Sequence, residues 1–179
     1  MKDISFTTAT PANAEEIASL HALSWQRHYR GIYPDSYLDH EVTSERKKIW
    51  LERFQQPNDN QYVIQARDQD QLIGFACTLF DIDDRYGALV DNLHVLQEHQ
   101  GRGLGKILLR KCAEWVLTEA PGTAIYLYVL KENQAALGFY THLGADLSPV
   151  LQYHGPAGTV DAVIRCTWDP ANLKVTLSK

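Results

Sequence analysis

The alternation of apolar and polar residues divides the chain into segments typical of helices and strands. Apolar positions that recur every three to four residues predict helices from Thr10-Pro11 to about Tyr29 and over 103–118 and 133–142. Short helical stretches are expected after Pro34, and the best defined of them covers 44–54. Short runs rich in β-branched and aromatic residues predict seven strands. They lie at 4–8, 62–66, 72–80, 88–96, 125–130, 150–153 and 160–168.

The predicted elements follow one another in the order β-α-α-β-β-β-α-β-α-β-β. The three strands between 62 and 96 are joined by short turns, which favours an antiparallel meander. This order predicts an α/β (α+β) fold in which helices flank a mixed, largely antiparallel central sheet. We expect one domain over residues 1–179, because a chain of this length suits a single hydrophobic core.

Composition narrows the class of protein. The chain is 45% hydrophobic and 22% charged, which is typical of a soluble globular protein, and its formal net charge is −5. A negative balance argues against general binding to nucleic acid or to anionic membranes, which need a basic surface. No apolar run approaches the roughly 20 residues that span a bilayer, and the first residues lack a signal-peptide core. We expect a cytoplasmic protein.

The number and spacing of the cysteines agree with a cytoplasmic location. Cys77, Cys112 and Cys166 are far apart in the sequence, and no C-x-x-C pair is present. This spacing favours reduced structural thiols over disulfides or a metal site, so we expect no bound metal.

The stretch HQGRGLGK, at 99–106, is a candidate phosphate site. It joins a predicted strand to a predicted helix, where glycines allow close approach of the backbone and the first N–H groups of the helix are free. The dinucleotide fingerprint G-x-G-x-x-G fails, because its third glycine falls at Lys106 or Leu108. The P-loop pattern fails as well, because Gln100 stands where its first glycine belongs. A turn that only redirects the chain is the other interpretation.

The pattern that fits is Q-x-x-G-x-G, met by Gln100, Gly103 and Gly105. It resembles the pyrophosphate-binding motif of the GNAT superfamily of N-acetyltransferases. One helix and one strand downstream, the stretch 133–140 is similar to a second motif of that family, N-x-x-A-x-x-x-Y. Both motifs together, in the family's order, cover about 88–145 and imply acetyl-CoA as the co-substrate.

The resemblance also implies which residues hold the cofactor. The turn would bind the pyrophosphate through its backbone, with Arg102 and Lys106 either adding charge or remaining solvated. The preceding strand would pair with the pantetheine arm, and an N–H there, that of Val95, would polarise the thioester carbonyl. The implied residues are Leu93, His94, Val95, Gln100, Gly101, Arg102, Gly103, Leu104, Gly105, Lys106, Asn133, Ala136 and Tyr140.

The two motifs indicate catalytic roles less directly than cofactor-binding roles. By resemblance, Tyr140 would protonate or hydrogen-bond the departing thiolate. Asp91 and His94 are the candidate bases, but a regular strand places them on opposite faces unless a bulge intervenes, as the family implies. Structural roles for both residues, and proton removal through a chain of waters, stay open.

Aromatic residues mark a candidate pocket for the acceptor amine. We expect Trp25, Tyr29 and Tyr33 to line it from one side and His154 from the other, although core packing would explain Trp25 and Tyr29 equally well. No cluster of acidic residues points to a polycation. A small amine, an amino acid, an antibiotic and a protein N-terminus all stay open as acceptors.

The sequence therefore predicts an N-acetyltransferase that moves an acetyl group from acetyl-CoA to a primary amine by direct attack in a ternary complex. No G-x-S-x-G nucleophile pattern competes with this interpretation. The alternatives are a non-catalytic acyl-CoA sensor of the same fold and, less well supported, a nucleotide-phosphate binder. The resemblance implies a homodimer as the assembly.

Overall fold

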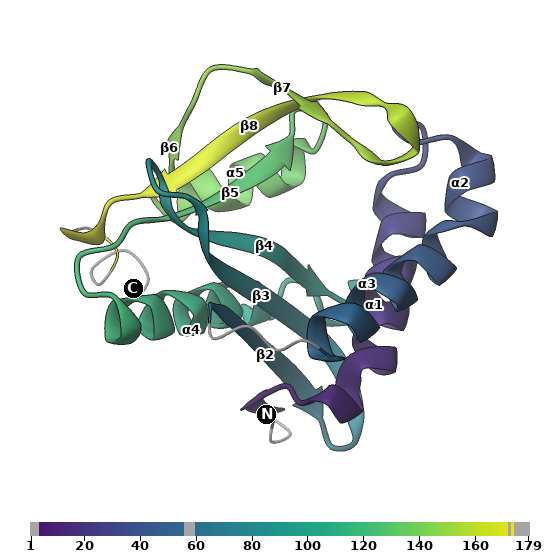
Figure 1. The fold of residues 1–179 in the computed structure, drawn as a ribbon, viewed down its shortest axis with the longest axis horizontal. Coiled ribbons are helices and arrows are strands. Elements are labelled where there is room, and N and C mark those ends of the chain that lie inside the picture. Colours follow the sequence, from purple (N-terminus) through teal and green to yellow (C-terminus); the bar gives the residue numbers. More distant parts are fainter. Residues whose placement is uncertain (1–3, 56–59, 172, 174–179) are drawn as a thin grey trace.

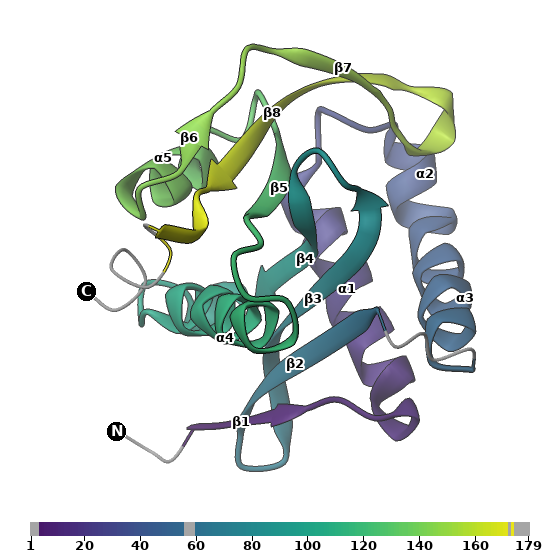
Figure 2. The same cartoon turned by 60° about the vertical axis from the view of Figure 1, so that its left-hand side comes forward.

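The computed structural model describes residues 4–55, 60–171 and 173, and within them an eight-stranded sheet carries helices on both faces (Figures 1 and 2). The strand order is β1-β2-β3-β4-β5-β8-β6, and β7 also pairs with β8. All pairings are antiparallel except that of β4 with β5. The strands are β1 Ile4–Thr8, β2 Gln61–Asp68, β3 Gln71–Asp83, β4 Gly87–Val95, β5 Ile125–Leu130, β6 Asp146–Leu147, β7 Leu151–His154 and β8 Val160–Trp168.

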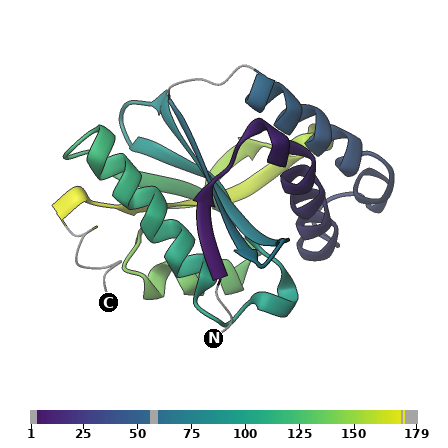
Figure 3. The ribbon, with the colours of Figure 1, turned by 90° about the horizontal axis from the view of Figure 1, so that it is seen from below.

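The helices form two groups on opposite faces of the sheet, which separate clearly when the molecule is seen from below (Figure 3). The α1 and α3 helices cover one face, and the α4 and α5 helices pack into the core on the other. The helices are α1 Ala14–His28, α2 Asp35–His40, α3 Val42–Gln55, α4 Leu104–Glu119 and α5 Gln134–His142. Single turns of 3-10 helix lie at Pro11–Asn13, Gln97–His99 and Pro156–Gly158.

Apolar periodicity explains why these helices form and where they pack. In α4, the buried side chains recur at helical spacing and face β2, β3 and β4. In α1 the buried stripe faces α3 and β3 instead. Burial of these two stripes against one sheet produces a hydrophobic core on each of its faces.

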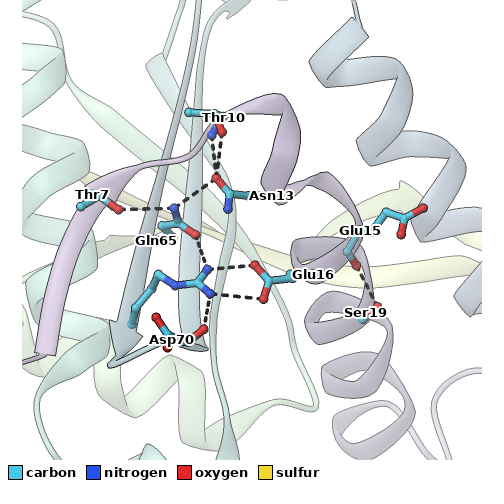
Figure 4. A network of polar contacts seen from close by, with 9 residues as sticks. Thr7, Thr10, Asn13, Glu15, Glu16, Ser19, Gln65 and Asp70 are labelled. Carbon is cyan, nitrogen blue, oxygen red and sulfur yellow. Dashed lines mark hydrogen bonds and ion pairs between the residues drawn. The ribbon is translucent and has the colours of Figure 1, made fainter.

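The start of α1 is anchored to the first two strands by polar contacts (Figure 4). The Thr10 N–H donates to Asn13 Oδ1 at 2.9 Å, and Gln65 Nε2 of β2 donates to the same oxygen at 3.2 Å. Arg67 of β2 forms an ion pair with Glu16 at 2.9 Å. The predicted N-cap at Thr10 thus marks a 3-10 turn, after which the α-helix itself begins at Ala14.

Strands β4 and β5 separate soon after they meet. They pair only at Ala88 with Ile125 and at Leu89 with Tyr126. Beyond these pairs, β4 follows β3 while β5 follows β8, so the two halves of the sheet diverge. The gap between the strands exposes backbone edges in the middle of the sheet.

The predicted fold class is confirmed, and the differences concern short elements. The structure adds the two-residue strand β6, which was not predicted, and it gives bounds to α2, one of the short helical stretches expected after Pro34. The strand predicted at 150–153 lies at Leu151–His154, and the last helix begins one residue later, with Asn133 as its N-cap.

Candidate functional site

A cavity of about 1080 Å³ occupies the gap between β4 and β5. Its wall includes most of β4, the turn before α4, the first part of α5, the aromatic residues of α1 and the hairpin of β7 and β8. One continuous space therefore contacts almost every segment that the sequence singled out.

The glycine turn presents free backbone donors to this cavity. Gly103 is the N-cap of α4 with a φ of +80°, and Gly101 has a φ of +72°. Both angles lie in the left-handed region that favours glycine. Ile107 is the first residue whose N–H bonds back to the turn, at Gly103 O, so the N–H groups of Leu104, Gly105 and Lys106 lack helical partners. With the helix dipole, they suit an anion.

Gly105 has a packing role in the same turn. A Cβ atom there would lie 3.3 Å from Cζ of Phe139 in α5, closer than ordinary contact. The absent side chain thus lets α4 approach α5 at the cavity's edge.

The two charged side chains of the glycine turn do not contribute to the wall of the cavity. Neither Arg102 nor Lys106 is among the residues that line the cavity. The Arg102 guanidinium lies 2.8 Å from Nδ1 of His99 and is exposed. Arg102 is exposed and Lys106 is half-buried, so their part in binding phosphate stays a prediction.

The free edge of β4 has unpaired backbone groups that can form hydrogen bonds with an extended ligand. Leu96 N donates to Ile73 O of β3, and antiparallel bonding alternates, so the backbone groups of Leu93 and Val95 point away from β3 into the gap. Gln100 Nε2 donates to Val95 O at 3.0 Å. The Val95 N–H and both polar groups of Leu93 therefore face the space where a partner strand is missing.

The second predicted motif lines the cavity from α5. Asn133 caps the helix by accepting the Ala136 N–H at 3.1 Å, and both residues contact the cavity. Tyr140, one turn further along the helix, is 7% exposed and packs on Phe139 and Trp168. Burial raises the pKa of its phenol, so the hydroxyl stays protonated and can donate a hydrogen bond.

His94 lines the cavity on the α1 side. Its Nδ1 lies 2.8 Å from Ser24 Oγ, and its ring packs on His21 with centroids 4.6 Å apart. Burial, assisted by the charges of His28 and Arg46, lowers the pKa of His94 to about 3. The imidazole is therefore neutral near pH 7.

Asp91 contacts the same side through a bulge. Cys77 pairs with Asn92 and Thr78 pairs with Val90, which leaves Asp91 as the extra residue. Asp91 forms an ion pair with Arg53 of α3 at 2.7 Å, and Arg53 also donates to Asn92 Oδ1 at 3.3 Å. The bulge implied by the family is present, and the carboxylate is engaged by a cation.

The aromatic residues of α1 and its following loop form the opposite wall. Trp25 stacks on Tyr33 with centroids 5.4 Å apart and 12° between the ring planes, and Tyr29 packs edge-on against both. His154 approaches from the β7–β8 hairpin. All four predicted acceptor residues thus line the cavity, but the third core cluster also includes Trp25, Tyr29 and Tyr33.

Several buried polar groups of the site were not predicted. Arg46 lies over the Trp25 ring at 4.4 Å and donates to Glu45 Oε1 at 2.8 Å. His21 is 2% exposed and accepts the Trp50 Nε1 hydrogen at 3.0 Å. Asp161 of β8, 8% exposed, accepts the Tyr33 hydroxyl at 2.6 Å. Their only sequence signal is a charged or polar residue within an apolar element.

Other kinds of site find no support in the described ranges. No group of three or more histidine, cysteine or acidic side chains in 4–55, 60–171 and 173 has the arrangement of a metal site. Among the same residues, no helix has both the length and the apolar character needed to cross a membrane. The three cysteines are buried and unpaired, and burial raises the pKa of Cys112 to about 12.

Comparison with protein families and curated proteins points to one group. Residues 15–145 match the model of the Acetyltransferase (GNAT) family. The uncharacterised N-acetyltransferase YobR of Bacillus subtilis is 28% identical over 131 residues, which cover 73% of this chain and 51% of YobR. The matched region of this chain thus spans about half the length of that relative. YuaI of the same organism is 27% identical over 129 residues, 70% of each chain.

Solved structures share the fold. The PaiA N-acetyltransferase of Thermoplasma acidophilum, in complex with coenzyme A, superposes with a TM-score of 0.70 at 20% identity, covering 93% of this chain and 99% of that one. YncA of Salmonella typhimurium with acetyl-CoA gives 0.67 at 18% identity and 94% coverage of both. The spermidine N-acetyltransferase SpeG of Vibrio cholerae gives 0.67 at 18% identity and 95% coverage of both.

Proposed function

The chain belongs to the GNAT family of acetyltransferases, and from this premise we propose that it transfers an acetyl group from acetyl-CoA to a primary amine of a small molecule or peptide. The transfer occurs by direct attack in a ternary complex. One observation carries the proposal: a single cavity joins the glycine turn, the open edge of β4, Tyr140 and the aromatic wall. Donor and acceptor can therefore meet in it without a covalent enzyme intermediate.

The residues present fit acetyl-CoA. The free N–H groups at the start of α4 suit its pyrophosphate, and the outward backbone groups of Leu93 and Val95 suit its amide-bearing arm. Asn133 and Ala136 border the same path. Bound there, acetyl-CoA supplies an activated acetyl thioester. Solved neighbours of the same fold include complexes with coenzyme A and with acetyl-CoA.

Tyr140 supplies a hydrogen-bond donor to the leaving sulfur. A phenol is a weak acid, so it acts by a positioned hydrogen bond and a late proton transfer to the thiolate. Its neutral, buried state suits this role, since no charge has to be desolvated before it donates.

His94 accepts the proton that the amine loses, directly or through a water. When Nδ1 carries the ring proton and donates to Ser24 Oγ, Nε2 is left as an acceptor. The low pKa of the imidazole makes it a weak base, so a chain of waters that leads away from His94 completes the transfer. Asp91 is the poorer candidate, because Arg53 already holds its carboxylate.

The rival function is a sensor that binds acyl-CoA without turnover. The two are separated by thermal unfolding with acetyl-CoA, coenzyme A, NADH or ATP in excess, followed by a thiol-release assay with a panel of amines. A ligand at about 100 times its dissociation constant adds roughly 2.7 kcal/mol, a shift of several degrees for a chain of this size. Stabilisation by acetyl-CoA without thiol release from any amine would favour the sensor. Stabilisation by ATP alone would refute both.

A further inference from the structure

All but one of the charged side chains that line the cavity lie beside a side chain of opposite charge. Apart from histidines, they are Glu45, Arg46, Arg53, Asp83, Asp91 and Asp161. Each of the first five has an opposite charge beside it: Glu45 lies at 2.8 Å from Arg46, Arg53 at 2.7 Å from Asp91, and Asp83 at 2.7 Å from Arg85.

Asp161 is the exception. None of the ion pairs found among the described residues includes it. Its only hydrogen bond to a described side chain comes from the Tyr33 hydroxyl, at 2.6 Å. A carboxylate that is only 8% exposed and lacks a cation loses much of its hydration, and the Tyr33 hydroxyl replaces only part of it. A cationic ligand in the cavity would restore that balance.

The position of this carboxylate is built into the fold. A Cβ atom on Gly155 would lie 1.9 Å from Asp161 Oδ2, so only glycine leaves room for it in the β7–β8 hairpin. Tyr33, held by its stack on Trp25, donates its hydroxyl hydrogen to the same oxygen. Aromatic rings beside a carboxylate are the usual surroundings of an organic cation.

Asp161 lies at the acceptor's end of the cavity. Trp168, on which the Tyr140 ring packs with centroids 5.8 Å apart, ends β8, whereas Asp161 lies near its start. Asp161 pairs across the hairpin with Tyr153, beside the aromatic wall. The carboxylate therefore belongs to the wall that would face the acceptor, in the same cavity as Tyr140.

We propose that Asp161 binds a second positive charge of the acceptor, so that the preferred substrates are diamines. This inference rests on the proposed function. A nitrogen that Asp161 holds as an ammonium has no lone pair with which to attack, so the nitrogen that is acetylated is a different one. Arg46 lies in the same cavity, but Glu45 already neutralises it, which disfavours acceptors that carry a carboxylate.

A binding experiment tests the inference without turnover. Putrescine and cadaverine are titrated by calorimetry into the full chain saturated with coenzyme A, with n-butylamine, n-pentylamine and γ-aminobutyrate as matched probes. Each diamine is expected to bind about tenfold or more tightly than its monoamine. Asp161→Asn removes that difference, whereas Asp146→Asn, an exposed carboxylate on β6, retains it.

A kinetic experiment on the same proteins separates failure of the inference from failure of the function. In wild type, kcat/KM is expected to favour diamines about tenfold, and Asp161→Asn raises KM for diamines with the dissociation constant of acetyl-CoA unchanged. Tyr33→Phe, which keeps the carboxylate, gives a smaller rise in KM. Transfer to all amines without preference for diamines overturns the role of Asp161 and leaves the function standing.

The remaining outcomes are also decisive. Diamine binding that depends on Asp161, without any acetyl transfer, refutes the proposed function and supports the cation site. Tighter binding of γ-aminobutyrate than of the diamines overturns the inference in favour of an anion site at Arg46. Should Asp161→Asn fail to fold, as its unfolding midpoint would show, the preference of the wild type and the Tyr33→Phe variant decide.

Discussion

Asp91 and His94 face the same side of β4 although three positions separate them. Asp91 reaches Arg53 of α3, and His94 reaches Ser24 of α1. A regular strand would place them on opposite faces, and the bulge at Asp91 removes that restriction. The bulge thereby presents one ion-paired carboxylate and one neutral imidazole to a single cavity.

Substitution of these two residues should have different effects. His94→Ala is expected to lower kcat at least tenfold, because the ring nitrogen that accepts the amine's proton is lost. Asp91→Asn is expected to lower the free energy of unfolding by about 1–3 kcal/mol, because Arg53 loses the negative charge that it pairs with, and to have a smaller effect on kcat. Steady-state kinetics and urea unfolding of both variants measure this. A greater loss of kcat in Asp91→Asn would make Asp91 the base.

Removal of the Tyr140 hydroxyl should affect chemistry and spare binding. Tyr140→Phe keeps the ring that packs on Phe139 and Trp168 but has no proton to donate to the sulfur. We expect turnover to fall at least tenfold, with the dissociation constant of coenzyme A nearly unchanged. Single-turnover kinetics beside calorimetry test this. Near-normal turnover would remove Tyr140 from the mechanism.

The two histidines with lowered pKa values predict that stability falls in mild acid. Burial holds the pKa of His94 at about 3 and that of His21 well below its usual value near 6.5. Below pH 6.5 the unfolded chain therefore binds protons that the folded chain does not, so the free energy of unfolding decreases as pH falls. Each histidine contributes up to about 1.4 kcal/mol per pH unit.

The measurement is urea unfolding between pH 7 and pH 5, with His94→Asn as the comparison. The variant cannot titrate at this position and should show the shallower dependence. An unchanged slope would mean that the surroundings of His94 do not keep it neutral in the folded protein.

The corner where β4 meets β5 should not tolerate a side chain at Gly87. Its φ is +86°, and a Cβ atom would lie 2.3 Å from Ala124 O. Gly87→Ala is expected to cost about 2 kcal/mol or more of stability, because both strain and overlap act. Gly138→Ala in α5 is the matched control, since a Cβ atom there meets nothing within 4 Å. Equal stability of the two variants would contradict the geometry of the corner.

Elements with long, regular patterns were predictable from the sequence. The apolar stripe of α4 and the glycine spacing before it located the turn and the helix within about a residue. The helix α2 was expected only as a short helical stretch without bounds, because six residues hold fewer than two turns of periodicity. The strand β6 was missed because two residues carry no alternation at all.

The candidate site likewise contains some residues that the sequence predicted and others that only the structure reveals. Tyr140, Asn133 and the turn belong to local patterns, so their approach to one cavity was predicted. Asp161 and Tyr33 are 128 positions apart in the chain, and only the folded structure brings them together. The bulge at Asp91 depends on the partner strand, so the sequence of β4 alone does not show it.

The two-pair contact of β4 with β5 also bears on when the site is complete. Without further pairs, the two halves of the sheet are joined by backbone pairing only at Ala88 and Leu89. In the proposed function, a pantetheine arm laid along Leu93 and Val95 would take the place of the missing partner strand. Binding of the donor would then complete the sheet beside the acceptor, and each departure of coenzyme A would leave that edge open again.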